Sequence, residues 1–403
     1  MRDLRECEKP SVPQSAPQPT CQVFNLPPPW PSNATQLLYA RIPRLTKIVP
    51  GEGSLLVAET AARIFADFAD PQTVNRAADT AWQVPLWNAL NAAGLPLAWV
   101  PEALGGSGAS IAEGFAIVGV AGRFALAVPF TETLAAGWLL AQGGIEAPST
   151  PMTVAPFRPR DRISIDAEGR LTGRAAGVSF AREAEHIAVL ADDGASQHIA
   201  LVRSEQCRIA GGRNLAGDPL DAVVFERVEP LRMTRGPQDF DRQSLMLMGS
   251  TIRSLQIAGA LETILSLSVR YANERVAFER PIGKFQAVQQ NLARLAGETA
   301  AAIAVTGSAA DAIAQGDQFD DNVFLEAVSA KIRTAEAAGE GSAIAHQVLG
   351  AIGFTQEHVL HRFTLRMLSW RDDFGNESYW ANELGNRVAF RGADEFWPWV
   401  ASR

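Results

Sequence analysis

Arginine and aromatic side chains are concentrated in the segment 270–286. It contains Arg270, Arg275, Arg280, Phe278, Phe285 and Gln286. A helix entering this segment is expected to end near Ala277, because Pro281 cannot continue it, and the next helix begins near Lys284. Guanidinium groups match phosphate oxygens in geometry, and a new helix N-terminus adds partial positive charge. The segment therefore indicates a phosphate-binding corner, with a charged helix cap making ordinary surface ion pairs as the alternative.

A second segment, 346–357, combines small residues with a helix end. Gly350, Ala351 and Gly353 allow another backbone or a ligand to approach closely, and Glu357 can open the following helix. On its own this pattern is also typical of a helix C-terminus.

Long helices are expected to position both segments. Apolar residues recur at helical spacing from about 54 to 147, and again over 243–277, 285–315, 320–350 and 356–371. Short alternating runs between these regions predict strands, at 162–165, 169–173, 186–191, 199–203 and 222–226. A brief extended stretch is expected at 97–100, after the helix end at Gly94.

The expected fold is mainly α with a small β domain. It has an N-terminal helical domain, a middle β-barrel-like domain and a C-terminal antiparallel four-helix bundle. The expected boundaries are 1–52 for a disordered Pro-rich extension, then 53–147, 148–232 and 233–403 for the three domains. Ten of the 24 prolines fall in the first 50 residues, where no helical or strand period occurs. That segment cannot bury enough apolar surface to offset its ordering entropy.

Composition excludes several classes of function. The chain has 403 residues, is 47% hydrophobic and carries a net charge of −8, which argues against nucleic acid as the main partner. No apolar run reaches the roughly 18 residues of a membrane span. Cys7, Cys21 and Cys207 form neither a disulfide framework nor a metal motif, so a cytoplasmic protein is expected. His358 and His361 lack an evident third ligand, and no metal site is expected.

Both chemical segments resemble blocks of the acyl-CoA dehydrogenase family, and the resemblance covers roughly residues 54–400. The family run Tyr-x-x-x-Arg-x-x-Phe-Gly-x-x-Ile-x-x-x-Gln stands here as Tyr271, Arg275, Phe278, Glu279 in the Gly place, Ile282 and Gln286. The block Gln-x-Leu-Gly-Gly-x-Gly-x-x-x-Glu stands as Gln347, Leu349, Gly350, Ala351, Gly353 and Glu357. Val100-Pro-Glu-x-x-Gly-Gly-x-Gly108 is similar to the family's N-terminal signature.

The resemblance implies an FAD-dependent oxidoreductase that dehydrogenates an acyl-CoA thioester across Cα–Cβ in lipid or fatty-acid catabolism. A carboxylate would take the α-proton and flavin the β-hydride. Arg275 would bind the FAD pyrophosphate, while Phe278 and Gln286 would line the adenosine-diphosphate part. Gln347, Gly350 and Ala351 would contact the same cofactor from a neighbouring subunit. A dimer or tetramer is therefore implied, with electron-transfer flavoprotein as the electron acceptor.

The catalytic base departs from the family pattern. Counted without gaps from Gly353, Phe374-Gly375-Asn376 falls on the family's Glu–Gly–Thr. Phe374 cannot abstract a proton, so Asp373 is the candidate base, with a salt-bridged exposed turn as the alternative role of that residue. The second position that some members use, on the helix before the Arg block, is Gly249.

The β region departs as well. Thr172-Gly173-Arg174-Ala175-Ala176-Gly177-Val178-Ser179 resembles a family strand, and Ser179 would contact the flavin ring. The family's flavin-covering motif has no match between 148 and 170. These departures resemble the short subunits of bacterial hetero-oligomeric acyl-CoA dehydrogenases, in which a partner chain supplies part of the cofactor site or the base. The sequence therefore predicts an acyl-CoA dehydrogenase or a subunit of one, with a catalytically silent partner subunit as the alternative.

Overall fold

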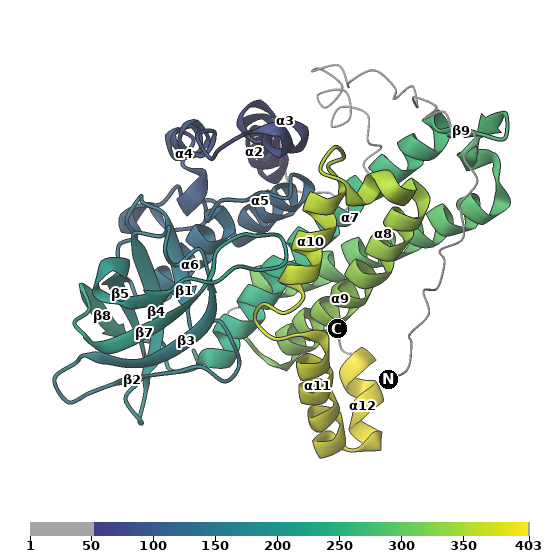
Figure 1. The fold of residues 1–403 in the computed structure, drawn as a ribbon. Helices are drawn as coiled ribbons and strands as arrows, with labels where there is room; N and C mark the ends of the chain where they lie inside the picture. The colour runs from purple at the N-terminus through teal and green to yellow at the C-terminus, as the bar shows by residue number, and fades with distance from the viewer. Residues whose placement is uncertain (1–51, 317, 402–403) are drawn as a thin grey trace, which may run out of the picture. The chain divides into compact units, whose positions relative to one another are not determined.

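The computed structural model describes residues 52–316 and 318–401, so the expected Pro-rich extension lies outside the described residues except for Glu52. Helices precede and follow a central sheet in the chain (Figure 1). The helices before the sheet are α2 (Glu52–Phe68), α3 (Pro71–Arg76), α4 (Gln83–Ala92), α5 (Ile111–Arg123) and α6 (Phe130–Gln142). Helix α5 begins at a capping box, in which the Ser110 and Glu113 side chains bond each other's backbone amides.

The expected extended stretch at 97–100 is wrong. Gly94 adopts a left-handed conformation with φ of 67°, and a 3-10 turn, η1 (Leu95–Leu97), follows directly. The amides of Ala98 and Val100 donate to the carbonyls of Leu95 and Leu97, so the backbone is satisfied locally. A second 3-10 turn, η2 (Glu102–Leu104), lies in the Pro/Gly region that follows.

The strands lie between Met152 and Arg235 and form an 8-stranded sheet. They are β1 (Met152–Ala155), β2 (Arg162–Ile165), β3 (Leu171–Ser179), β4 (His186–Asp192), β5 (Gln197–Arg203), β6 (Arg208–Ala210), β7 (Leu220–Val228) and β8 (Arg232–Arg235), with a 3-10 turn η3 (Ser204–Gln206) between β5 and β6. The hydrogen-bonded order is β6-β7-β3-β2-β4-β5-β8, and β1 pairs with β4 in parallel. Helix α6 packs on β1, β4 and β5.

Long helices follow the sheet. They are α7 (Arg242–Glu274), α8 (Gln286–Gln315), α9 (Asp321–Leu349), α10 (Leu360–Trp370), α11 (Glu377–Arg391) and α12 (Ala393–Ala401). Helices α7, α8 and α9 pack on one another, and α10 packs on α7 and α9. The short connection between α8 and α9 makes this packed pair antiparallel. The expected fold class, mainly α with a small β region and a C-terminal bundle, is confirmed.

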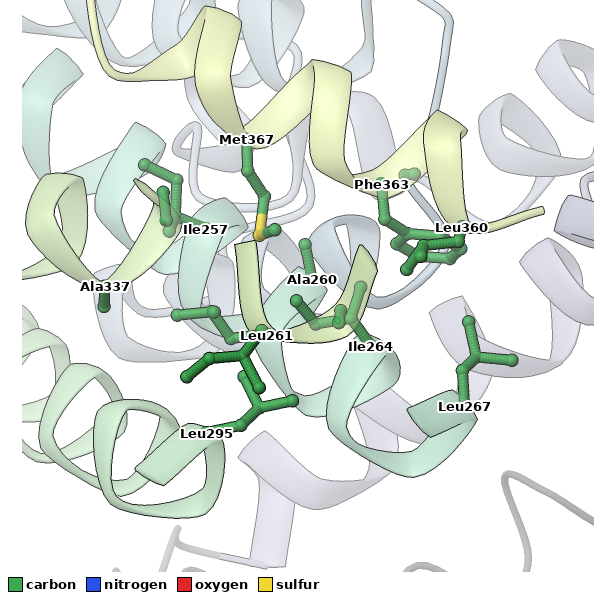
Figure 2. Packing of buried hydrophobic residues seen from close by; sticks show 14 of the residues in the cluster. Ile257, Ala260, Leu261, Ile264, Leu267, Leu295, Ala337, Leu360, Phe363 and Met367 are labelled. Atoms are coloured by element: carbon green, nitrogen blue, oxygen red, sulfur yellow. The ribbon is translucent and has the colours of Figure 1, made fainter. Parts of the chain in front are cut away.

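The core of the bundle is a continuous cluster of buried apolar side chains. Figure 2 shows residues from all four helices, with Ile257, Ala260, Leu261, Ile264 and Leu267 from α7, Leu295 from α8, Ala337 from α9, and Leu360, Phe363 and Met367 from α10. Each fully buried large side chain of this kind stabilises the fold by about 1.5–3 kcal/mol. Within the described residues, no helix is both long and apolar enough to cross a bilayer.

Candidate active site

A buried arginine in the middle of α7 forms the centre of the candidate site. The side chain of Arg253 is 2% exposed. Its three nitrogens donate five hydrogen bonds, equal to its number of N–H groups. The acceptors are Asp373 Oδ2 at 2.8 Å, Glu132 Oε1 at 2.6 Å, Gln256 Oε1 at 2.6 Å, Ser179 Oγ at 3.2 Å and Thr131 Oγ1 at 3.3 Å. One guanidinium therefore joins α6, β3, α7 and the turn after α10.

The two carboxylates around Arg253 keep it charged. Burial alone would lower the pKa of Arg253, but Glu132 and Asp373 outweigh that effect and raise it. Burial raises the pKa of Asp373, while Arg253 and Lys331 oppose the rise. The candidate base is thus a buried, paired carboxylate that is 7% exposed. The alternative of an exposed salt-bridged turn is wrong for Asp373, and its role as a base stays a prediction.

An aromatic ring fills the space beside Gly249. A Cβ built on Gly249 would lie 2.3 Å from a carbon of the Phe374 ring. Phe157 packs on the same ring, with its ring centroid 4.1 Å from that of Phe374. Phe374 has a φ of 56°, and its carbonyl accepts a 2.9 Å hydrogen bond from Trp380 Nε1. The two positions singled out for a base are therefore adjacent, and both lack a carboxylate.

The arginine-rich segment forms a hairpin between α7 and α8. Strands β9 (Val276–Ala277) and β10 (Arg280–Pro281) pair through a two-residue turn, and η4 (Ile282–Lys284) leads into α8. Both turn residues, Phe278 and Glu279, have positive φ, as a type I′ turn requires. Phe278 is 88% exposed, and Arg275 and Gln286 are exposed as well. Among the described residues, the Arg275 guanidinium has no hydrogen-bond or ion-pair partner.

The second predicted cofactor segment lies at the same end of the bundle. Gln347 is on the last turn of α9, and η5 (Gly350–Phe354) follows. Gln347, Gly350 and Ala351 are exposed, and nothing lies within 4 Å of a Cβ built on Gly350. Ile282 of η4 and Ile352 of η5 pack against the same apolar cluster. The structure thus brings the two exposed segments to one end of the bundle, while Asp373 and Ser179 belong to the buried Arg253 network.

Comparison with known proteins identifies the family. Residues 244–387 match the family model for the acyl-CoA dehydrogenase C-terminal domain. Acyl-CoA dehydrogenase IpdE2 of Mycobacterium tuberculosis is 27% identical over 325 residues, covering 79% of this chain and 92% of the relative. Acyl-CoA dehydrogenase FadE27 of the same organism is 28% identical, covering 75% and 88%. The chain belongs to the acyl-CoA dehydrogenase family.

Solved structures share the acyl-CoA dehydrogenase fold over nearly their whole length. The ChsE4-ChsE5 complex from Mycobacterium tuberculosis aligns with a TM-score of 0.73 at 23% identity, covering 85% of this chain and 99% of that one. A variant of the Tcur3481-Tcur3483 steroid ACAD also aligns with a TM-score of 0.73, at 25% identity, covering 84% and 98%. The fold is therefore that of the acyl-CoA dehydrogenase family.

Ser179 is turned inward in this acyl-CoA dehydrogenase chain. It is buried near the end of β3, where its hydroxyl accepts from Arg253 and its carbonyl accepts a 2.8 Å hydrogen bond from Thr153 Oγ1. Its predicted contact with a flavin ring remains untested. Within this structure its hydroxyl is hydrogen-bonded to the Arg253 guanidinium.

Sequence reasoning missed Arg253, Glu132 and Phe157. One sequence feature pointed to Arg253: it is the single charged residue between Gln243 and Leu261, in a stretch otherwise built of apolar, small and neutral polar residues. A lone charge in such a stretch needs a buried partner. Glu132 lies in α6 and Phe157 in the loop after β1, and nothing local in the sequence links them to this arginine. In the described part of the chain, no group of His, Cys, Asp and Glu side chains is arranged to hold a metal ion.

Proposed function

We propose that this chain is a subunit of a hetero-oligomeric acyl-CoA dehydrogenase that helps to bind FAD and leaves the base to a partner chain. The observation that carries the proposal is the Phe374 ring packed against Gly249, which fills the space where either base position would present a carboxylate. Proton abstraction needs a carboxylate within hydrogen-bond reach of the α-carbon proton. The remaining nearby carboxylates, Asp373 and Glu132, are bonded to Arg253.

The exposed end of the bundle supports the cofactor part of the proposal. Arg275 offers a free guanidinium for pyrophosphate oxygens, and Gly350 leaves open space for a close approach. Phe278, in the turn of the hairpin, and Gln286, the first residue of α8, are exposed as well. These residues fit the phosphates and adenosine of FAD held at a subunit interface, where the bound flavin would accept the hydride. The name of a structural neighbour, the ChsE4-ChsE5 complex, supports pairing with a related but different chain.

The decisive experiment compares the chain alone with the chain co-expressed with a second acyl-CoA dehydrogenase chain from the same organism. We expect no stable flavin absorbance from the chain alone, and a yellow complex whose flavin is bleached by an acyl-CoA. A panel of straight-chain and steroid-ring thioesters would identify the substrate class. If the chain alone binds one FAD per chain and is bleached by substrate, the requirement for a partner is wrong.

Two substitutions in that complex separate FAD binding from proton abstraction. Arg275→Ala is expected to lower bound FAD at least tenfold, whereas Arg208→Ala, in an exposed pair with Glu226, leaves it unchanged. Asp373→Asn is expected to leave flavin bleaching intact, because the base belongs to the partner. Abolished bleaching with normal FAD content in Asp373→Asn would instead assign catalysis to Asp373.

A further inference from the structure

Lys331 on α9 is a fully buried lysine with a single hydrogen bond. Its side chain is 0% exposed, and Nζ donates to the carbonyl of Trp370 at 2.7 Å. An ammonium group has three N–H donors, so two find no acceptor among the described residues. No described carboxylate lies close enough to form an ion pair with it. The other described lysine, Lys284, is exposed.

The charges that face Lys331 come from three elements. Arg253 approaches from α7, Asp372 and Asp373 from the turn after α10, and Glu377 from α11. Burial lowers the pKa of Lys331 to about 7, and Arg253 lowers it as well, while the three carboxylates oppose the change. Geometry and charge therefore agree that the buried amine holds its proton weakly.

The hydrogen bond of Lys331 anchors the turn that carries Phe374. Trp370 is the last residue of α10, and the connecting turn, residues 371–376, leads directly to α11. Lys331 holds the start of this turn, Arg253 holds its middle through Asp373, and Trp380 holds its end through the Phe374 carbonyl. The 371–376 turn contains Phe374 and Gly375, whose φ values are 56° and 92°.

We propose that Lys331 makes the 371–376 turn a pH-sensitive latch that opens more readily as the pH falls toward neutrality. When the turn swings away, water reaches Lys331, and the solvated amine binds a proton at its ordinary high affinity. The closed turn keeps water out and disfavours that proton. Protons therefore bind preferentially to the open form and shift the equilibrium toward it. Opening would withdraw the Phe374 ring from Gly249. The latch therefore controls whether another molecule can enter the space beside Gly249, whether or not this chain is catalytic.

Hydrogen exchange of the intact chain tests the latch. The measured peptides would contain the amides of Arg371 and Asp372, which are bonded to the carbonyls of Met367 and Ser369. With pKa values of 10.5 in the open form and about 7 in the closed form, the opening constant, corrected for intrinsic exchange, should rise about 50-fold from pH 9 to pH 7. Below pH 7 it should rise by no more than about a further twofold, because both forms are then protonated.

Three variants serve as controls. Lys331→Met and Lys331→Gln cannot titrate, so their opening constants should not change between pH 9 and pH 6; the glutamine also keeps a donor for the Trp370 carbonyl if the methionine variant does not fold. Lys284→Met, which removes an exposed lysine, should retain the full pH dependence. An opening constant that is flat in the unmodified chain, or equally pH-dependent in Lys331→Gln, would overturn the latch.

Discussion

At the scale of single residues, Arg253 binds together parts of the chain that are far apart in sequence. Its partners Glu132 and Asp373 are separated from it by 121 and 120 positions. A buried ion pair gains little net stability over a well-packed apolar core, because both charges lose their hydration. Removal of one partner is costly, since the others remain buried and unpaired. The network therefore specifies how these elements fit together more than it adds to stability.

Replacing Arg253 by methionine should strongly destabilise the fold. Two buried carboxylates lose their counter-ion, and we expect the free energy of unfolding to fall by about 3–5 kcal/mol. Urea denaturation followed by circular dichroism measures this change. Arg208→Met, which breaks an exposed pair with Glu226, should cost less than about 1 kcal/mol. Similar losses in the two variants would contradict the central role of Arg253.

His358 should make the fold sensitive to mild acid. Its side chain is buried, with 8% exposed, and its Nδ1 accepts a hydrogen bond from the Leu360 amide, so the ring is neutral. Burial lowers the pKa of His358 to about 4, and Arg270 lowers it as well. The unfolded chain binds this proton near pH 6.5. The contribution of neutral His358 to the free energy of unfolding is therefore fully present above pH 6.5 and is lost as the pH falls from 6.5 to 4.

His358→Asn should reduce this acid sensitivity while keeping an acceptor for the Leu360 amide. The stability lost between pH 7 and pH 5 should shrink by on the order of 2 kcal/mol relative to the unmodified chain. Thermal unfolding at the two pH values provides the measurement. An unchanged difference would show that His358 has the same pKa in the folded protein as in the unfolded chain.

At the scale of elements, α5 and α7 pack closely because glycines lie at their contact. A Cβ on Gly122 would lie 2.2 Å from the Gln256 carbonyl oxygen, and one on Gly259 would lie 2.2 Å from the Gly119 oxygen. A Cβ on Gly119 itself would meet nothing within 4 Å. Gly119 and Gly122 lie on the same helix, but only a Cβ at Gly122 would collide with α7. Alanine substitutions at these two positions therefore separate the effect of close packing from that of helix propensity.

Gly122→Ala should force α5 and α7 apart and lower the free energy of unfolding by about 1–3 kcal/mol. Gly119→Ala on the same helix should leave stability unchanged or raise it by up to about 1 kcal/mol, because alanine favours the helix. Chemical denaturation of both variants gives the comparison. A loss of stability in Gly119→Ala as large as that in Gly122→Ala would mean that the helices do not pack as described.

The hairpin between α7 and α8 holds a glutamate where the backbone favours glycine. Glu279 has a φ of 68°, a left-handed conformation that costs a side-chain-bearing residue about 1–2 kcal/mol. Glu279→Gly should therefore raise the melting temperature. The greater flexibility of glycine in the unfolded chain offsets part of this increase in stability. Glu279→Ala removes the same carboxylate without relieving the backbone and should give no increase. A rise in both variants would assign the effect to charge instead.

At the scale of the whole molecule, the periodicity of apolar residues predicted the positions of the long helices and of several strands. The segment expected at 285–315 is the helix Gln286–Gln315, and the strand expected at 162–165 is Arg162–Ile165. Sequence periodicity gave the wrong conformation where a local turn sets the backbone, as at Leu95–Leu97, where a 3-10 turn follows Gly94. The domain boundaries and the roles of Arg275, Gln286, Gln347 and the other cofactor residues stay predictions.

The candidate site was harder to predict than the fold, because its members come from four separate elements. Motif spacing singled out Gly249 and Phe374 as the two empty base positions, but only the fold places them against each other. Asp373 directly precedes Phe374 in the sequence, which makes it the candidate base. Its pairing with Arg253 depends on how α7 and the 371–376 turn meet, which spacing along the chain cannot reveal.

The contact between Gly249 and Phe374 also fixes the order in which a working base could arise in this chain. Any side chain added at 249 collides with the ring, so a carboxylate there becomes tolerable only after position 374 has become small. A change of Phe374 to glutamate meets no such barrier from Gly249, whose missing side chain leaves room. One route therefore needs two substitutions in a set order and the other needs one, so a carboxylate can be introduced at position 374 more directly than at position 249.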